Sequence, residues 1–279
     1  MAEPLEPRNP RIVAAAKLHR SAQRRKTGSF LAEGANSVGA ALAAGRVREL
    51  FYSASAAGRE HELVAGAAAS GVRTTLVSER AAQHLGETVT APGLVAICDL
   101  LDVPLSTLLA ATDGEPGAAG PRAAVPALFA VPVEIAEPGN AGTLIRVADA
   151  VGVDGVVLAG DTVDPHNGKC VRASAGSLFH VPVARERDIS AALDALSAAG
   201  VTLLATTARG ELDLDDADPV LAGPVAWLFG NEAHGLAPGV AERADHRVRI
   251  PIRGRAESLN LAAAAAICLY ASSRVSRPR

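Results

Sequence analysis

The chain has 279 residues, of which 49% are hydrophobic and 20% charged, and its net charge is −3. At roughly 150 residues per domain this length indicates two domains, and the apolar content excludes global disorder. The sequence has no uninterrupted apolar run of about 18 residues, which argues against a transmembrane helix, and the segment around Glu3 and Glu6 lacks the apolar core of a secretory signal.

The first half of the chain alternates short β-type runs with helical patterns, which predicts an α/β layer structure. Asn9 followed by Pro10 is typical of a helix start and predicts one helix to about Thr27. Strands are expected in SFLAEG, VRELFYS, VRTTLV and GLVAICDL. Helices are expected near 35–44, near 57–69 and after a Ser78 cap.

A stretch rich in Gly, Ala and Pro follows and predicts a linker. We therefore expect a first domain over 1–109, a linker over 110–123 and a second domain over 124–279. The strands expected in the second domain are apolar throughout, as in a parallel sheet covered on both faces. Its helices are expected from about Ala141, near 167–176, near 189–199 and from about Ser258.

Three polar clusters interrupt the second half, each at a strand-to-helix junction: EPGNAGTLIRVADAVG, LFGNEAHGL and IPIRGRAESLNL. In open parallel sheets, ligands bind beyond the carboxyl ends of the strands, where helix N-termini offer free N–H groups. The three clusters therefore predict one shared pocket. No G-x-G-x-x-G, phosphate-binding loop or G-x-S-x-G pattern is present, which disfavours the familiar nucleotide and serine-hydrolase chemistries.

The histidines show no zinc-ligand spacing, and Cys98, Cys170 and Cys268 are far apart and odd in number. This pattern favours reduced thiols in the cytoplasm over a disulfide framework or a metal site. We expect no metal and no membrane association.

The ordered trio N-x-G-x-x-x-R, G-N-E-x-x-G-L and I-P-x-x-x-x-x-E-S-L-N-L resembles the three motifs of the SpoU (TrmH-type) RNA ribose methyltransferases of the SPOUT superfamily. The resemblance covers 124–279, and 169–183 also matches that family. The first half, above all FLAEGANSVGAAL, is more loosely similar to the ribosomal-protein-like α/β substrate-binding domain of rRNA members. The resemblance implies a SPOUT domain with a deep trefoil knot, binding S-adenosylmethionine and forming a homodimer through its last helix.

By this resemblance, the catalytic group comprises Asn140, Arg146, Glu232, Ser258 and Asn260. The cofactor site is expected to comprise Thr206, Thr207, Leu228, Phe229, Gly230, Asn231, Gly235, Ile250, Ile252, Ser258, Leu259 and Asn260. Gly230 would allow a close approach of the cofactor, and the backbone at Ile250 and Leu259 would bracket the adenine. A role for His234, as surface residue or RNA contact, stays open.

Each of these residues also has a simpler structural interpretation. Asn140 would cap its helix while Arg146 pairs with Asp149 on a solvated face, and Ser258 would cap the last helix. A plain turn explains the glycines of the second motif but not a carboxylate at Glu232 beside an apolar strand, which is costly unless it is paired. Because a guanidinium is always protonated, we expect Arg146 to bind the target phosphate and stabilise the emerging alkoxide rather than act as a base.

Charge is segregated along the chain despite the small total. A second basic cluster lies at 243–255, and acids gather in ELDLDDAD at 211–218. The N-terminal segment from 8 to 32 holds seven cations and no acid, which predicts phosphate contacts over a merely solvated helix face. The predicted RNA-binding residues are Arg8, Arg11, Lys17, Arg20, Arg24, Arg25 and Lys26.

The sequence thus predicts a two-domain α/β RNA 2′-O-ribose methyltransferase that uses S-adenosylmethionine and acts on rRNA. Two alternatives remain: the same chemistry on tRNA, and a non-catalytic RNA-binding or assembly factor with a decayed pocket. The intact polar set of the three motifs argues against decay.

Overall fold

The structure is a computed structural model that describes residues 3–88, 91–110 and 127–276. It contains two compact units, one formed by Met1–Leu101 with Asp164–His180 and the other by Asp102–Val163 with Val181–Arg279. Apart from Ala110, which ends a helix, the predicted linker lies outside the described residues. The segment Asp164–His180, from the second half of the sequence, thus packs with the first half.

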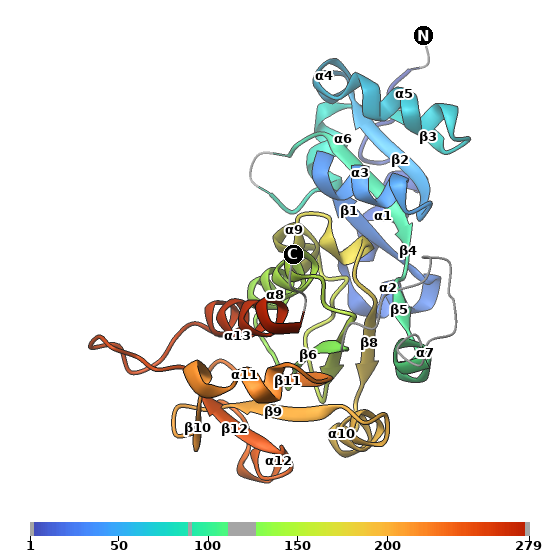
Figure 1. The fold of residues 1–279 in the computed structure, drawn as a ribbon. Coiled ribbons are helices and arrows are strands. Elements are labelled where there is room, and N and C mark those ends of the chain that lie inside the picture. Colours follow the sequence, from blue (N-terminus) through green and yellow to red (C-terminus); the bar gives the residue numbers. More distant parts are fainter. Residues whose placement is uncertain (1–2, 89–90, 111–126, 277–279) are drawn as a thin grey trace. The chain divides into compact units, whose positions relative to one another are not determined.

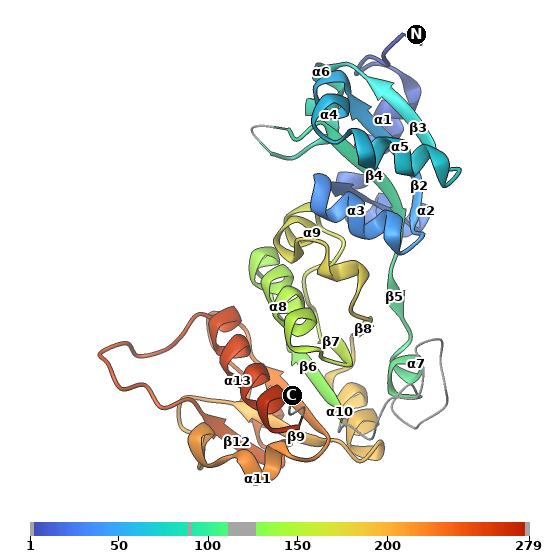
Figure 2. The same ribbon diagram turned by 45° about the horizontal axis from the view of Figure 1, so that its top comes forward.

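Within the described residues, the first unit has a four-stranded sheet in the order β1-β4-β2-β3 (Figures 1 and 2). β4 is antiparallel to β1 and β2, whereas β2 and β3 are parallel. The strands are β1 Ser29–Glu33, β2 Val47–Ser53, β3 Arg73–Val77 and β4 Leu94–Asp99. The helical segments are α1 Pro10–Ala16, η1 Lys17–His19, α2 Ser21–Thr27, α3 Ala35–Ala43, α4 Ala54–Arg59, α5 His61–Ala69, α6 Glu79–Leu85, α9 Gly168–Ser174 and η2 Ser177–Phe179.

Two helix caps predicted for this unit are confirmed. The side chains of Asn9 and Ser78 accept backbone hydrogen bonds at the starts of α1 and α6. The single helix predicted to Thr27 is wrong, because the chain is extended at Arg20 and divides it into α1, η1 and α2. At this break the backbone carbonyls of Leu18 and His19 accept hydrogen bonds from the buried guanidinium of Arg24, which is described below.

The second unit confirms the predicted parallel sheet. Among the described residues it has eight strands in the order β10-β12-β9-β11-β6-β7-β8-β5, and all pairs are parallel (Figure 1). The strands are β5 Asp102–Val103, β6 Leu128–Pro132, β7 Gly155–Ala159, β8 Val183–Glu186, β9 Thr202–Thr206, β10 Leu212–Asp213, β11 Val225–Phe229 and β12 His246–Arg249. The helices are α7 Leu105–Ala110, α8 Pro138–Val151, α10 Ile189–Ala198, η3 Leu214–Asp216, α11 Asp218–Leu221, α12 Pro238–Ala241 and α13 Leu261–Ser276.

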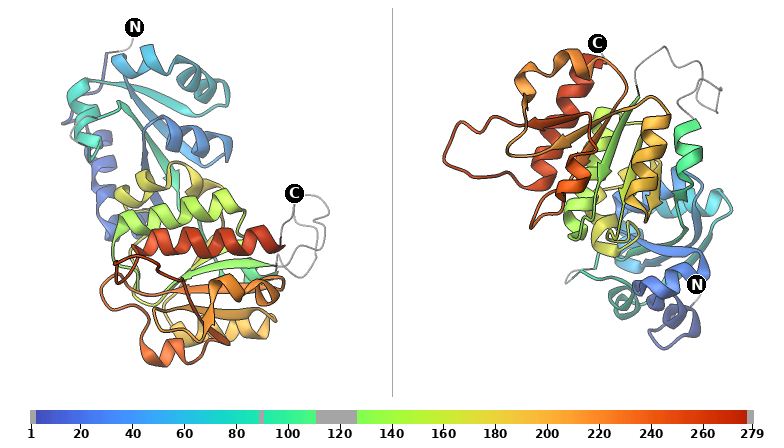
Figure 3. Two further views of the ribbon diagram at one scale, coloured as in Figure 1. Left: turned by 60° about the vertical axis from the view of Figure 1, so that its left-hand side comes forward. Right: turned by 90° about the horizontal axis from the view of Figure 1, so that it is seen from below.

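Helices cover both faces of this sheet, as its uniformly apolar strands require. Leucines of α7 and α10 pack in one core cluster with Phe129, Val131 and Leu228. On the other face α13 lies beside α8, as the left view in Figure 3 shows. There the indole N–H of Trp227 donates to the hydroxyl of Ser272 at 2.8 Å, and neither residue is exposed. This buried bond fixes α13 against the central strand β11.

The sequence analysis made expectations about the cysteines, about metal binding and about membrane-spanning helices. All three cysteines are buried and unbonded, and burial raises the pKa of the Cys170 thiol to about 12. The described part of the chain contains no group of three or more His, Cys, Asp or Glu side chains that could hold a metal ion. Within the same ranges no helix has both the length and the apolarity needed to cross a membrane.

Candidate active site

A cavity of about 640 Å³ lies at the carboxyl edge of the larger sheet. Its wall is built from the segments that follow β9, β11 and β12 and from the starts of α8 and α13. This is the edge at which ligands of open parallel sheets bind. Eleven of the twelve predicted cofactor residues line it: Thr206, Thr207, Phe229, Gly230, Asn231, Gly235, Ile250, Ile252, Ser258, Leu259 and Asn260.

Leu228 is the exception among the predicted cofactor residues. Its side chain is fully buried in the core cluster on one face of the sheet, because alternate strand residues point to opposite faces. Its carbonyl accepts a hydrogen bond of 2.8 Å from the hydroxyl of Thr206, a cavity residue on the neighbouring strand. Leu228 therefore supports the wall without lining it.

The three motifs meet at the edge of the cavity. The amide of Asn140 donates to the Glu232 carboxylate at 3.1 Å, and the amide of Asn260 donates to the side-chain oxygen of Asn140, also at 3.1 Å. These residues are separated by 92 and 120 positions along the chain. The convergence that the sequence predicted is thus present for one residue of each motif.

The Glu232 carboxylate is at the centre of this network, and it also accepts hydrogen bonds from backbone N–H groups. The N–H groups of Ala136 and Glu137 donate to the two carboxylate oxygens at 3.2 and 3.1 Å. Partial burial acts to raise the pKa of Glu232, but the hydrogen bonds from Asn140 and from the backbone outweigh it and lower the pKa. The paired carboxylate expected from the sequence is therefore found, and it joins the β11 loop to the start of α8.

The helix caps at the site differ from those expected. α8 begins at Pro138 and is capped by the Glu137 side chain, so Asn140 lies inside the first turn with its amide free to reach Glu232. α13 begins at Leu261, and the side chain of Asn260 accepts hydrogen bonds from the first turn. Capping by Asn140 and by Ser258 is thus wrong, which leaves Ser258 lining the cavity ahead of the helix.

The loop after β11 is held by its own backbone. Asn231 and Gly235 exchange two backbone hydrogen bonds, of 3.0 and 2.8 Å, and the Asn231 amide donates to the carbonyl of Glu134. A Cβ on Gly230 would lie 2.1 Å from the Gly235 carbonyl carbon, so the close approach at this glycine is made by the loop itself. Glu134 has a left-handed φ of 52°, which turns its carbonyl toward Asn231.

Arg146 is not among the residues that line the cavity. It is exposed on α8, six residues beyond Asn140 and so about 9 Å farther along the helix axis. It forms no hydrogen bond or ion pair with another described residue, so the expected alternative of pairing with Asp149 is not found. Within one chain, the three motifs converge without their arginine.

Several cavity residues were not predicted from the sequence. They include a second carboxylate, Glu257, and the small or apolar residues Ala208, Leu236, Ala241, Val248, Leu261 and Ala264. Glu257 and Leu261 are fixed positions of the third motif and Leu236 is one of the second, so their place in the motifs was the signal that could have found them. His234 also lines the cavity and is exposed.

Neutralising Glu232 tests the network. We expect Glu232→Gln to lower turnover about tenfold. The NH2 group of the new side-chain amide would face the three N–H donors that now bond to the carboxylate, and at least one of these hydrogen bonds would be lost. The lowered pKa means that the carboxylate stabilises the fold fully above its unfolded pKa of about 4.3 and loses this effect as the pH falls further. Rates of the methyl transfer expected from the three motifs, taken at neutral pH, and melting temperatures from pH 3 to 7 measure the two effects. Glu242→Gln, at an exposed carboxylate, is the matched control, and equal behaviour of the two variants would contradict the role of the network.

Among the predicted RNA-binding residues, five are exposed cations for which no intramolecular pair within the described ranges is present: Arg8, Lys17, Arg20, Arg25 and Lys26, of which Arg25 contacts only the Ser21 hydroxyl. Arg11 is exposed but engaged, since it pairs with Glu49, bonds to Thr75 and lies 6.0 Å from the Phe51 ring centroid. The unpaired cations keep their charge available for phosphate.

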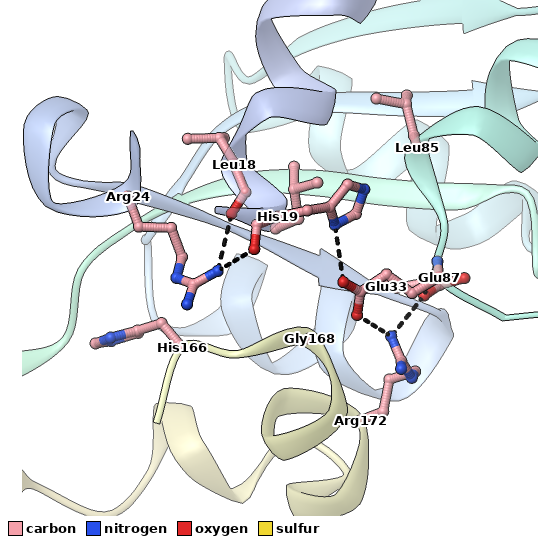
Figure 4. A pocket seen from close by; sticks show the side chains of 10 residues that line it. Leu18, His19, Arg24, Glu33, Leu85, Glu87, His166, Gly168 and Arg172 are labelled. Atoms are coloured by element: carbon pink, nitrogen blue, oxygen red, sulfur yellow. Dashed lines mark hydrogen bonds and ion pairs between the residues drawn. The ribbon is translucent and has the colours of Figure 1, made fainter. Parts of the chain in front are cut away.

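Arg24 differs from its neighbours, because its side chain is only 4% exposed. Its guanidinium donates to the carbonyls of Leu18 and His19 (Figure 4). It also donates to the carboxylate of Asp164 at 2.6 and 3.0 Å. Close by, Arg172 pairs with Glu33 and Glu87 at 3.1 and 3.2 Å. A direct RNA contact by Arg24 is not compatible with this burial, and Arg24 instead fixes the helix break to Asp164.

This fold and its cavity are those of a known protein family. The described cavity and parallel sheet define an α/β protein with a ligand site at the carboxyl edge of its strands. A model of the SpoU rRNA Methylase family matches residues 127–270, and one of the MRM3-like substrate binding domain matches 9–96. The chain therefore belongs to the SpoU rRNA methylase family.

Some similar proteins match most of the chain and others about half of it. The 23S rRNA (guanosine(2553)-2′-O)-methyltransferase RlmP of Bacillus subtilis is 33% identical over 94% of this chain and 96% of its own length. The 23S rRNA (uridine(2479)-2′-O)-methyltransferase of Streptomyces viridochromogenes is 40% identical over 49% of each chain. The structure of the AdoMet-bound rRNA methyltransferase from Sinorhizobium meliloti is 32% identical, with a TM-score of 0.79 over 95% of both chains.

Proposed function

We propose that this chain transfers a methyl group from S-adenosylmethionine to a ribose 2′-hydroxyl of ribosomal RNA. The observation that carries the proposal is the hydrogen-bonded union of Asn140, Glu232 and Asn260 at one cavity. Similar proteins are named as 2′-O-methyltransferases of 23S rRNA, which favours rRNA over tRNA. The intact network argues against a decayed pocket.

The cavity suits S-adenosylmethionine in size and in the kind of groups that it offers. Its volume of about 640 Å³ lies within the range of roughly 300–1,000 Å³ of small-molecule sites. Apolar side chains of Phe229, Ile250 and Leu259 can hold the adenine, and polar groups such as Ser258 and Asn260 can orient the rest. When bound, the cofactor supplies an electrophilic methyl group on its sulfonium.

This chain's own residues have to orient the 2′-hydroxyl and stabilise the charge that develops on its oxygen. Because this hydroxyl is a very weak acid, a fixed cation near it lowers the barrier. Arg146 is that cation in our proposal, and it binds the adjacent phosphate through its planar fork. Glu232 holds Asn140, and Asn140 holds Asn260, so the second and third motifs stay in register with α8.

Arg146 reaches a cavity by dimerisation in this proposal. It is exposed and does not line the cavity of its own chain. The last helix and the loop before it present exposed apolar side chains, namely Ile252, Leu259, Ile267 and Tyr270. A homodimer through α13 would cover such residues and could place Arg146 of the partner subunit at the site.

The finer architecture is part of the same proposal. The trefoil knot is proposed from the chain's membership of the SpoU rRNA methylase family. We divide the chain into an RNA substrate-binding domain (1–109), a linker (110–123) and a methyltransferase domain (124–279). An rRNA substrate also implies a cytoplasmic location.

Transfer of a labelled methyl group in vitro tests the proposal. The full chain, given labelled S-adenosylmethionine and either 23S rRNA or tRNA, should methylate the rRNA at a ribose, and mapping in cells with and without the gene should show the lost 2′-O-methyl group. Methylation of tRNA alone would decide for the first alternative. Failure to bind the cofactor in calorimetry would decide for the non-catalytic one.

The exposed cations of the N-terminal segment have their own test. The triple variant Arg20→Gln, Arg25→Gln and Lys26→Gln should weaken RNA binding about tenfold at moderate salt and reduce the slope of log affinity against log salt by about 2. Cofactor binding should be unchanged. Filter binding at several salt concentrations measures this, with Arg73→Gln, an exposed cation elsewhere in the first unit, as control. Unchanged affinity in the triple variant would refute phosphate contact by this segment.

A further inference from the structure

The acidic run and the second basic cluster of the sequence are complementary in space. Three ion pairs join them: Arg247 with Glu211 at 2.8 Å, Arg249 with Asp213 through two hydrogen bonds, and Arg253 with Asp215 at 2.8 Å. We call this set of three pairs the charge ladder. Its first two rungs follow the parallel pairing of β10 with β12, in which Asp213 lies opposite Arg249.

The charge ladder continues into one wall of the cavity. β12 leads directly into Ile250 and Ile252, which line the cavity, and the acidic strand follows the cavity residues Thr206 and Thr207. The third rung reaches the exposed loop 250–260, which Figure 1 shows between β12 and α13. Among the described residues, Arg253 provides the one side-chain hydrogen bond or ion pair between positions 251 and 259.

A glycine beside the ladder shows how closely the two segments approach. A Cβ on Gly210 would lie 2.3 Å from the carbonyl oxygen of Arg247 and 2.8 Å from the backbone nitrogen of Arg249. Only a glycine lets the chain after β9 cross β12 at this distance. The acidic residues that follow Gly210 therefore lie opposite the arginines of the charge ladder.

We propose that the charge ladder and Gly210 are positioning elements that hold the 250–260 loop in the conformation that receives the cofactor. The pairs engage three of the five arginines at 243–255, so these three side chains are less available for phosphate than the unpaired cations of the N-terminal segment. Exposed ion pairs individually contribute little to global stability, and the ladder therefore acts on the shape of one loop more than on folding. The inference rests on S-adenosylmethionine as the proposed cofactor.

Calorimetry with S-adenosylmethionine on the full chain tests the ladder. Arg249→Gln should raise the Kd and the KM for the cofactor about fivefold to tenfold, with kcat at saturation and the melting temperature little changed. If the acids acted only by attracting the cationic cofactor, removing a cation would strengthen binding instead. Tighter or unchanged binding by Arg249→Gln would overturn the proposal.

Exchanging the two charges of one ion pair should restore the affinity for the cofactor. Asp213→Arg combined with Arg249→Asp keeps the net charge and the pair, and it should recover most of the affinity that either single change loses. Recovery no better than the singles would also overturn the proposal. Gly210→Ala should weaken binding further, and the charge variants keep the test valid if that protein does not fold. Asp99→Asn, which breaks the exposed pair with Arg48 in the first unit, is the matched control.

Binding of S-adenosylmethionine by the wild type distinguishes a failure of the proposed function from a failure of the positioning role. If the wild type does not bind S-adenosylmethionine, the proposed function fails, and the positioning role that rests on it fails as well. If the wild type binds and Arg249→Gln binds equally well, the proposed function stands and the positioning role is wrong.

Discussion

Arg146→Lys is expected to reduce turnover about 100-fold while leaving the affinity for S-adenosylmethionine unchanged. Lysine keeps the positive charge but replaces a planar fork of donors by a single ammonium, so the paired contacts to phosphate and to the emerging alkoxide are lost. Cofactor binding should be unaffected because, in the proposed function, Arg146 contacts the RNA phosphate and the emerging alkoxide and not the cofactor. Single-turnover methyl transfer and calorimetry measure the two quantities, and Arg187→Lys, an exposed arginine of the same unit, is the control.

The same residue tests the homodimer. Mixing Arg146→Ala protomers with Asn260→Ala protomers produces heterodimers in which one site has both an intact cavity and an intact arginine. If the arginine acts in the partner's site, an equal mixture should recover about a quarter of wild-type activity. No recovery would show that Arg146 acts in its own chain or not at all, and near-full activity of Arg146→Lys would contradict fork-specific contacts.

Arg24→Met is expected to lower the free energy of unfolding by about 3 kcal/mol, because it removes the cation and two of the hydrogen bonds that compensate the largely buried carboxylate of Asp164. That carboxylate is 15% exposed and would keep the backbone N–H of His166 as a partner. Burial would raise the pKa of Asp164, but hydrogen bonds from His166 and Arg24 lower it instead. This pair therefore stabilises the fold above the unfolded pKa of about 3.9 and loses its effect as the pH falls below it.

Urea unfolding of the full chain at pH 7 and near pH 3 measures this contribution, and the difference between wild type and variant should shrink in acid. Arg25→Met, at the exposed neighbour, is the matched control and should cost little stability while weakening RNA binding. If Arg24→Met weakened RNA binding at unchanged stability, Arg24 would be an RNA contact after all.

Most of the strands and longer helices could be predicted from the sequence because the relevant signals are local, whereas the short elements β5, β10, α7, α11 and α12 were not predicted. Apolar runs bounded by turn residues marked the strands, and Asn9 and Ser78 marked helix starts through their own side chains. The three motifs could be placed at one sheet edge, because the carboxyl ends of parallel strands share that edge. The individual residues of the cavity wall came from the family resemblance, and eleven of the twelve line the cavity.

The remaining features depend on partners that are distant in sequence. The helix break at Arg20 is stabilised by a guanidinium whose acceptor, Asp164, lies 140 residues away. Asn140 does not cap α8, because the helix begins two residues earlier with Glu137 as its cap, and the Asn140 amide inside the first turn donates to Glu232, 92 residues away. Leu228 was misplaced because strand alternation assigns it to the core face.

The sequence by itself thus determined the α/β layers, the parallel sheet and the set of polar residues at its carboxyl edge, since each of these follows from local pattern and from the geometry of parallel strands. Only the tertiary structure decided how the charges combine. It paired the acidic run with the second basic cluster, buried Arg24 and left Arg146 exposed, because a charge becomes buried or free according to which residues the completed fold brings to within hydrogen-bonding distance.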